Sequence, residues 1–226
     1  MKIIVFLLSL CVGLVGCDRD DSATAVTPAP QPAATQSSNL PRIVFLGDSL
    51  TAGMGLDADQ AFPALVGESL KSENLPVQVV NAGVSGDTTA GGLRRLDWLL
   101  KQKPDVIVGG LGGNDGLRGV EPGASEQNLR EIVTKSRNAG AQVLLLGMLI
   151  PPNYGPEYTK QFREIYPRIA KDLTVPLVPF VLEGVGGDAR LNQPDGIHPT
   201  AEGHQVLARN VLPHLRPLIQ KQTEKR

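Results

Sequence analysis

The stretch from Ile43 to Gly55, IVFLGDSLTAGMG, joins a short apolar run to a glycine, an acid and a serine. Residues 43–46 are all large and apolar without alternation, which is typical of a strand buried on both faces of a parallel sheet. A turn would explain Gly47 alone. A nucleophile displayed at the carboxyl end of the strand would also explain Ser49, provided that the chain supplies a base and donors for an oxyanion elsewhere.

Four other short apolar runs predict strands of the same kind: Val77–Val80, Val106–Val108, Val143–Leu146 and Leu177–Val178. Amphipathic stretches between the runs predict helices over Phe62–Ser72, Thr88–Lys101, Ser125–Ala139, Thr159–Asp172 and Ala201–Leu215. Strands that alternate with helices predict an α/β fold, in which a parallel sheet carries helices on both faces. Because ligands of such sheets bind at the carboxyl ends of the strands, a site is expected in the loops that follow them.

The composition is that of one globular domain. The chain has 226 residues, of which 41% are hydrophobic, enough for one sizeable domain. Lys and Arg together number 22 against 23 Asp and Glu, so we expect no binding of nucleic acid. The cysteines are Cys11 and Cys17 and the histidines are three in number, so we expect neither a disulfide framework nor a metal site in the domain.

The first forty residues differ from the rest. After Met1-Lys2, an apolar run extends from Ile3 to Val15, which is too short for a membrane span and suits a signal peptide. The run ends in LVGC, residues 14–17, which resembles the bacterial lipoprotein signal. We therefore predict a signal peptide over residues 1–16, a lipidated Cys17 that begins a tether over 17–40, and a domain over 41–220. The alternative is an ordinary secretory signal with an incidental cysteine.

The predicted tether is poor in apolar side chains, and Val26 is the only large aliphatic residue between Asp18 and Asn39. Such a segment cannot bury enough apolar surface to offset the entropy of ordering it. As a flexible coil of about 22 residues it would reach on the order of 25 Å. These features predict a domain held in the periplasm by a lipid anchor in the cell envelope. Asp18, directly after the cysteine, marks inner-membrane retention in enteric bacteria, but that rule varies, so the choice of membrane stays open.

Residues that suit nucleophilic catalysis follow the predicted strands. A serine hydroxyl is a poor nucleophile until a base takes its proton, and a histidine suits that role. A carboxylate can hold the histidine in the required tautomer, and Asp195 lies only three residues before His198. The backbone N–H groups of Ser49 and Gly83 and the side-chain amide of Asn114 can serve the oxyanion. The blocks are Gly47–Leu50, Asn81–Gly86, Gly109–Asp115 and Asp195–Pro199.

Four separated blocks with Ser, Gly, Asn and His, beginning with GDSL and ending with DxxH, resemble the SGNH (GDSL) hydrolase family. The segments VVNAGVSGDTTAGGLRRL (79–96), LGGNDGLRG (111–119), PPNYGPEY (151–158) and DGIHPTAEGH (195–204) are similar to its bacterial thioesterase I, lysophospholipase L1 and arylesterase branch. The resemblance covers about residues 41–217. It implies a flavodoxin-like three-layer α/β/α sandwich with a five-stranded parallel sheet, a Ser49–His198–Asp195 triad, oxyanion donors at Ser49, Gly83 and Asn114, and no metal or cofactor.

The same resemblance places the walls of an acyl pocket at the loop 150–157 and at residues 116–119, with Leu117 and Tyr154 as apolar contacts. The prolines of the first loop would equally suit a rigid connector. For Asp48 we expect a structural role, hydrogen-bonding the backbone of its loop, and for Asp87 a helix cap. We expect His204 and His214 on the surface, and Trp98 in a packing role.

The resemblance implies a serine hydrolase that cleaves short- to medium-chain acyl esters and thioesters through an acyl-serine intermediate. We expect the protein to be a monomer. Two alternatives stay open. One is an O-deacetylase of cell-envelope carbohydrates, which would share Ser49, Asp195 and His198. The other is a non-catalytic lipoprotein that uses the same groove only to bind a ligand, against which a complete triad argues.

Overall fold

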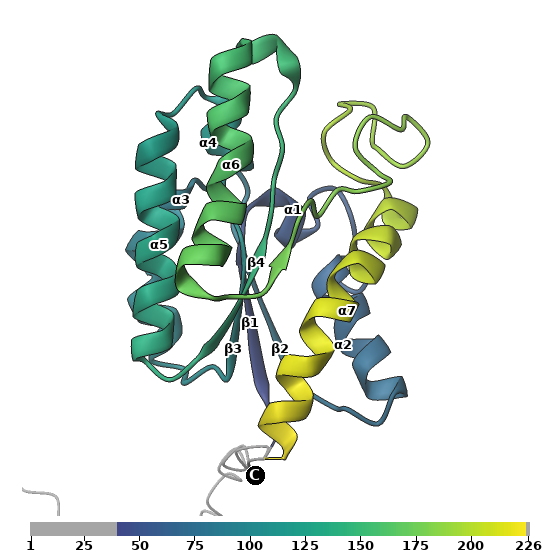
Figure 1. The fold of residues 1–226 in the computed structure, drawn as a ribbon. Helices are drawn as coiled ribbons and strands as arrows, with labels where there is room; N and C mark the ends of the chain where they lie inside the picture. The colour runs from purple at the N-terminus through teal and green to yellow at the C-terminus, as the bar shows by residue number, and fades with distance from the viewer. Residues whose placement is uncertain (1–39, 225–226) are drawn as a thin grey trace, which may run out of the picture. The chain divides into compact units, whose positions relative to one another are not determined.

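The computed structural model describes residues 40–224, and its parallel sheet has the order β2-β1-β3-β4-β5 (Figure 1). All neighbouring strands run parallel, which confirms the predicted five-stranded sheet. Each predicted run lies at least partly in a strand, and the bounds are β1 (Arg42–Gly47), β2 (Gln78–Gly83), β3 (Val106–Gly110), β4 (Gln142–Leu146) and β5 (Leu177–Val178). Residues 43–46 of β1 are fully buried, as expected for a central strand covered on both faces.

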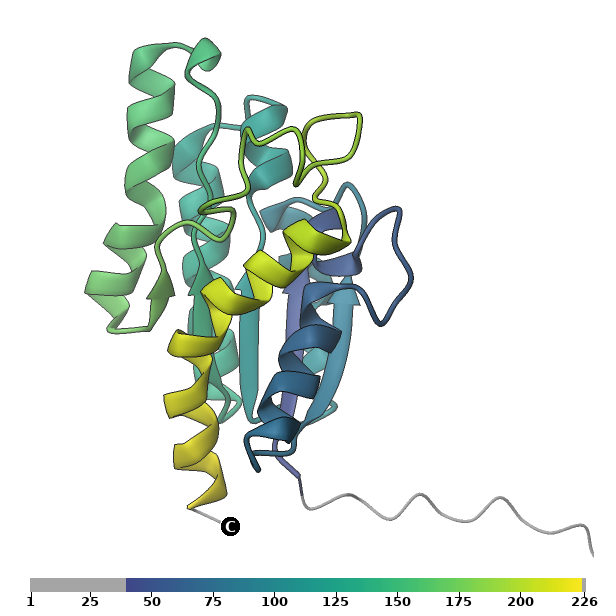
Figure 2. The ribbon, with the colours of Figure 1, turned by 90° about the vertical axis from the view of Figure 1, so that its right-hand side faces the viewer.

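Helices cover both faces of the sheet, which confirms the three-layer sandwich. Figures 1 and 2 show α2 (Phe62–Ser72) and α7 (Ala201–Thr223) side by side on one face. The other face carries α3 (Thr89–Leu100), α5 (Pro122–Asn138) and α6 (Pro156–Leu173). The remaining helical elements are short and follow strands: α1 (Ser49–Ala52), α4 (Gly113–Leu117) and η1 (Pro152–Tyr154).

Local sequence accounts for where several helices begin. Proline stands in the first turn of α2, α5 and α6, where its missing N–H costs nothing. Thr88 caps α3 by accepting a hydrogen bond from Gly91 N–H at 3.2 Å. The expectation that Asp87 caps this helix is therefore wrong, and Asp87 instead pairs with Arg95.

Two expectations about single side chains on helices were wrong. His204 is buried, with 1% of its surface exposed, and its Nδ1 accepts a hydrogen bond from Phe62 N–H where α2 begins. Burial lowers the pKa of His204 to about 4, so the ring is neutral. Trp98 on α3 is 65% exposed and does not pack in the core. The pattern on each helix predicted which face is apolar but not the burial of His204 or the exposure of Trp98.

The register of the sheet brings several chain segments to one edge. Gly47, the last residue of β1, pairs with Gly83 of β2 on one side and with Gly110 of β3 on the other. The loops that follow these strands therefore start at the same level and open together. Within residues 40–224, no helix combines the length and the apolarity that crossing a bilayer requires. The predictions for Cys17 and for the signal peptide lie outside the described residues.

Candidate active site

Ser49 is the first residue of α1, directly after the buried strand β1. The Asp48 side chain caps this short helix by accepting a hydrogen bond from Leu50 N–H at 3.0 Å, which confirms the structural role expected for it. Gly47 makes the sharp turn possible, because a Cβ at this position would collide with the side chain of Thr51 and with the Gly110 carbonyl. The backbone thus presents the Ser49 side chain at the carboxyl edge of the sheet.

The structure brings together the three side chains of the predicted triad. The Ser49 hydroxyl lies 2.9 Å from His198 Nε2, although 149 residues separate them in the chain. His198 Nδ1 lies 2.6 Å from Asp195 Oδ2. The other carboxylate oxygen, Oδ1, accepts hydrogen bonds from the N–H groups of Ile197 and His198, both at 3.0 Å. This arrangement places Nδ1–H against the carboxylate and leaves Nε2 to accept the Ser49 proton.

The carboxylate of Asp195 stays charged over the range in which such a site works. The His198 side-chain hydrogen bond, with the His198 and Ile197 N–H groups, lowers the pKa of Asp195 to about 2. An ionised carboxylate stabilises the imidazolium that forms when His198 takes a proton. The geometry therefore supplies a nucleophile, a general base and a group that orients the base.

The prediction that Gly83 serves the oxyanion is wrong. Its N–H donates to Asn81 Oδ1 at 3.0 Å, so this donor is already used. Gly83 ends strand β2 and packs against the backbone of Thr51 and Ala52, so closely that a Cβ would collide with it. Its glycine identity is explained by that close contact and not by a substrate.

Gly86, three residues further on, takes the place expected for Gly83. It lines the same cavity as Ser49, Asn114 and His198. Within the described part of the chain, the backbone N–H groups of Gly86 and Ser49 have no hydrogen-bond acceptor. The φ of Gly86, 78°, lies in the left-handed region, where glycine is favoured. The block Asn81–Gly86 contains two glycines, and only the end of β2 shows which of them lies past the strand.

Asn114 enters the site from α4, which follows β3. Its Nδ2 donates to the Asp87 carbonyl at 2.9 Å and lies 3.4 Å from Asp48 Oδ2. Burial raises the pKa of Asp48 to about 6, so its protonation changes close to neutrality. The Asp87 carbonyl holds the amide in a fixed orientation, and Asn114, Gly86 and Ser49 line the same cavity. These three groups are the candidate oxyanion donors.

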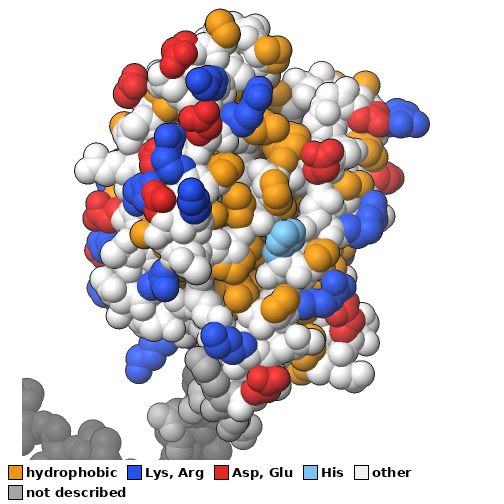
Figure 3. Space-filling view, in the orientation of Figure 1, with side chains coloured by type: hydrophobic (Ala, Val, Ile, Leu, Met, Phe, Trp, Pro, Cys, Tyr) orange, Lys and Arg blue, Asp and Glu red, His pale blue; other side chains and the backbone are white. Residues whose placement is uncertain are grey.

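A cavity of about 610 Å³ adjoins the triad, and its lining is mainly apolar. Figure 3 shows apolar side chains gathered in the middle of this face, beside a histidine. Leu117 lines the cavity, as predicted, whereas Tyr154 does not. The Tyr154 hydroxyl, at the end of η1, instead donates to the Leu117 carbonyl at 3.1 Å. The other apolar lining residues include Met54, Leu149, Ile150, Pro151, Phe180, Leu182 and Ile197.

The segments that carry these groups match a known protein family. The profile of the GDSL-like Lipase/Acylhydrolase family matches residues 45–206, a span that begins in β1 and ends in α7. The chain belongs to this family. The matched span contains all four blocks of the GDSL hydrolase, including Ser49, Gly86, Asn114 and His198.

Several curated proteins are similar to this GDSL hydrolase over most of their length. Esterase TesA of Pseudomonas aeruginosa is 47% identical over 186 residues, which cover 82% of this chain and 92% of that protein. The thioesterase 1/protease 1/lysophospholipase L1 of Escherichia coli K12 is 43% identical, over 78% of this chain and 84% of its own. An arylesterase of Vibrio mimicus is 39% identical, over 81% and 91%.

Solved structures agree with the fold of the GDSL hydrolase. The crystal structure of TesA superposes with a TM-score of 0.76 at 48% identity, covering 78% of this chain and 99% of that one. The psychrotrophic esterase EstA from a Pseudoalteromonas species, in a structure inhibited by monoethylphosphonate, superposes with a TM-score of 0.75 at 34% identity, covering 79% and 98%. Among the described residues of this chain, no three His, Cys, Asp or Glu side chains are grouped as metal ligands would be.

Proposed function

We propose that this GDSL hydrolase cleaves acyl esters and thioesters through a covalent acyl-serine intermediate. The observation that carries the proposal is the continuous hydrogen-bonded chain from the Ser49 hydroxyl through His198 to Asp195, at 2.9 and 2.6 Å. The names of the relatives, esterase, thioesterase, lysophospholipase and arylesterase, support the same reaction class.

The reaction follows from the positions of the groups. His198 Nε2 takes the hydroxyl proton as Ser49 Oγ bonds to the acyl carbon, and the carbonyl electrons move to the oxygen. The N–H groups of Ser49 and Gly86 and the Asn114 amide stabilise that oxyanion. The tetrahedral intermediate then expels the alkoxide or thiolate, which takes the proton from His198. In the second half of the reaction, His198 takes a proton from a water molecule as the water oxygen bonds to the acyl carbon of the acyl-serine. The second tetrahedral intermediate expels Ser49 Oγ, which takes that proton back from His198, and the carboxylic acid is released.

The apolar lining supports acyl groups longer than acetyl, because each methylene that the cavity covers leaves water. We expect kcat/KM on p-nitrophenyl esters to rise by about fourfold for each covered methylene from acetyl toward octanoyl. The measurement is steady-state hydrolysis over the acetyl, butyryl, hexanoyl and octanoyl series.

Acetylated carbohydrate, such as acetyl-xylan, is the matched comparison. Preference for acetyl esters in both assays would favour the O-deacetylase alternative, which uses the same triad. Absence of turnover on every acyl ester, together with failure of a fluorophosphonate to label Ser49, would favour a ligand-binding protein and contradict the proposal.

We further propose that the hydrolase is a lipoprotein of the bacterial cell envelope, anchored through Cys17 with its domain in the periplasm. The support is the apolar run before LVGC and the polar segment after it. Cys17→Ser in the full chain should move the protein from the membrane fraction to the soluble fraction, measured by blotting after fractionation. An unchanged distribution would contradict the anchor, without bearing on the catalytic proposal.

A further inference from the structure

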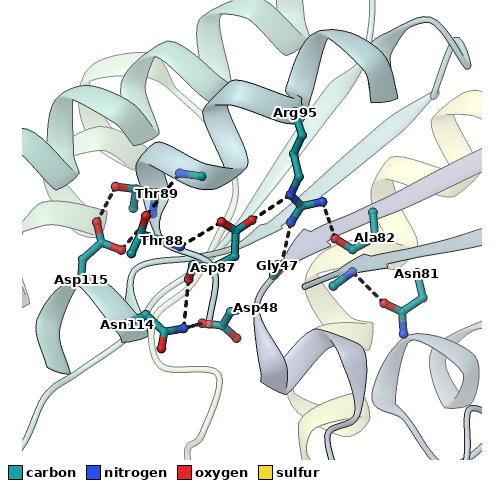
Figure 4. A network of polar contacts seen from close by, with 12 residues as sticks. Gly47, Asp48, Asn81, Ala82, Asp87, Thr88, Thr89, Arg95, Asn114 and Asp115 are labelled. Carbon is teal, nitrogen blue, oxygen red and sulfur yellow. Dashed lines mark hydrogen bonds and ion pairs between the residues drawn. The ribbon is translucent and has the colours of Figure 1, made fainter. Parts of the chain in front are cut away.

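Arg95 lies on α3, outside the triad and the oxyanion donors, yet it is hydrogen-bonded to the chain segments that lead to Ser49 and Gly86 (Figure 4). Its side chain is 23% exposed, and all three of its guanidinium nitrogens donate hydrogen bonds. Nε donates to Asp87 Oδ2 at 2.8 Å, Nη1 to the Ala82 carbonyl at 2.6 Å, and Nη2 to the Gly47 carbonyl at 2.8 Å.

Each partner of Arg95 precedes or holds one of the oxyanion donors. Gly47 lies two residues before Ser49, at the end of β1. Ala82 lies near the end of β2, just before the turn that carries Gly86. The Asp87 carbonyl accepts the hydrogen bond that orients the Asn114 amide, at 2.9 Å.

The turn that contains Gly86 is attached to the same points. Val84 N–H donates to the Gly47 carbonyl at 3.0 Å, so this oxygen accepts from both the turn and Arg95. Asp87 N–H in turn donates to the Val84 carbonyl at 3.0 Å. The guanidinium thus joins the end of β1, the end of β2 and the residue that closes the turn. Only Arg offers several donors in one rigid plane that can do this.

Helix α3 is anchored at its start without Arg95. The buried carboxylate of Asp115 accepts hydrogen bonds from Thr89 N–H at 2.9 Å and from the Thr89 hydroxyl at 2.5 Å. Ser125 donates to the same carboxylate at 3.0 Å, which ties α5 to this point. Thr88 caps the helix. The contacts of Arg95 therefore fix the ends of β1 and β2 and the turn, and the placement of α3 depends on them less.

We propose that Arg95 is a positioning residue that sets the mutual geometry of the three oxyanion donors. This inference rests on the proposed hydrolase function, because an oxyanion forms only if an acyl group is attacked. Without the guanidinium, Asp87 loses its ionic partner, and its carbonyl no longer holds the Asn114 amide at a fixed place. Donors that are misplaced by a fraction of an ångström stabilise the transition state less, while substrate binding in the cavity is little affected.

The test replaces Arg95 with glutamine in the full chain. We expect kcat on p-nitrophenyl esters to fall by about 10- to 100-fold with KM changed by less than about threefold. Arg94→Gln is the matched control, because Arg94 is exposed on the same helix, its side chain makes no hydrogen bond or ion pair within residues 40–224, and the substitution removes the same charge. Its kcat should equal that of the wild type.

A double-mutant cycle separates positioning from a general structural effect. In an Asn114→Ala background, Arg95→Gln should cost less than about fivefold, because one of the donors that Arg95 aims is already absent. Equal losses in both backgrounds would overturn the inference, as would a kcat for Arg95→Gln within twofold of the wild type. Should Arg95→Gln fail to fold, Arg95→Lys is measured below its own melting temperature. Lysine keeps the positive charge but lacks the planar guanidinium with its several donors. An undiminished kcat for Arg95→Lys would also overturn the inference.

The wild type and Ser49→Ala distinguish this failure from failure of the proposed function. Ser49-dependent turnover with an unaffected Arg95→Gln variant would reject only the positioning role. Absence of Ser49-dependent turnover in the wild type would reject both. Addition of guanidinium at millimolar concentration to Arg95→Ala should restore part of the lost kcat. The absence of any restoration would count against a direct role of the Arg95 guanidinium.

Discussion

Replacing Ser49 with alanine should lower kcat by roughly 10⁵- to 10⁶-fold on every ester and thioester that the protein hydrolyses. The hydroxyl oxygen, Oγ, is the atom that bonds to the acyl carbon. Its proton is the one that His198 Nε2, 2.9 Å from Oγ, accepts. Without it, the oxyanion donors and the cavity remain, and they leave only the residual catalysis that binding provides. The measurement is hydrolysis of p-nitrophenyl octanoate together with labelling by a fluorophosphonate, which should be lost as well.

Ser72→Ala is a suitable control for this experiment. Ser72 is exposed at the end of α2, and within residues 40–224 its hydroxyl donates only to the Ser69 carbonyl. Turnover and labelling should both match the wild type. Persistent turnover in purified Ser49→Ala, with the label found on another residue, would remove Ser49 from the role of nucleophile.

Asp195→Asn should lower kcat by about 10³- to 10⁴-fold while leaving the fold unchanged. The substituted side chain can keep the acceptor that binds the Ile197 and His198 N–H groups, so the loop is retained. The other atom becomes an NH₂ group that faces His198 Nδ1 across 2.6 Å. Two donors cannot share that contact, so the imidazole is driven toward the tautomer whose Nε2 carries the proton and cannot act as base.

The pKa of Asp195, lowered to about 2, implies that the wild-type carboxylate is ionised throughout an assay from pH 5 to 9. The loss in Asp195→Asn should therefore persist across that whole range. Asp188→Asn is the matched control, because Asp188 lies in the same connection between β5 and α7 and its Oδ1 accepts a hydrogen bond from Arg190 N–H, two residues later. Within residues 40–224, no hydrogen bond or ion pair joins Asp188 to a histidine. A kcat for Asp195→Asn within tenfold of the wild type, with the melting temperature unchanged, would contradict a triad that depends on this carboxylate.

The sequence predicted the sheet well because its strands are continuous apolar runs bounded by glycine and polar residues. Phe62–Ser72 was predicted with the observed bounds, since proline marks its first turn and its apolar face is regular. The last helix continues to Thr223, eight residues past the predicted end at Leu215, despite Pro213 and Pro217. These prolines lie on the exposed side of the helix, where the solvent can satisfy the carbonyls that they leave unpaired.

The site was predicted less completely. Ser49, Asn114, Asp195 and His198 stand in blocks after predicted strands or in a short motif, and the resemblance of these blocks to the SGNH family assigned their roles. For the oxyanion the sequence predicted Gly83, and Gly86 was not considered, because a run of residues does not show where a strand ends. The family likeness identifies the loop 150–157 as a wall of the pocket but not which of its side chains line the cavity, so the prediction for Tyr154 is wrong.

The sequence alone determined the succession of strands and helices along the chain, the chemistry of the reacting side chains, and the edge of the sheet at which these side chains gather. Those features depend on local periodicity and on the common direction of parallel strands, which a chain carries in its own order. Only the tertiary structure decided which N–H groups are available to an oxyanion and that Arg95 ties the ends of β1 and β2 to Asp87. A hydrogen bond depends on distance and direction to within a fraction of an ångström, and those are set by packing between segments far apart in the chain.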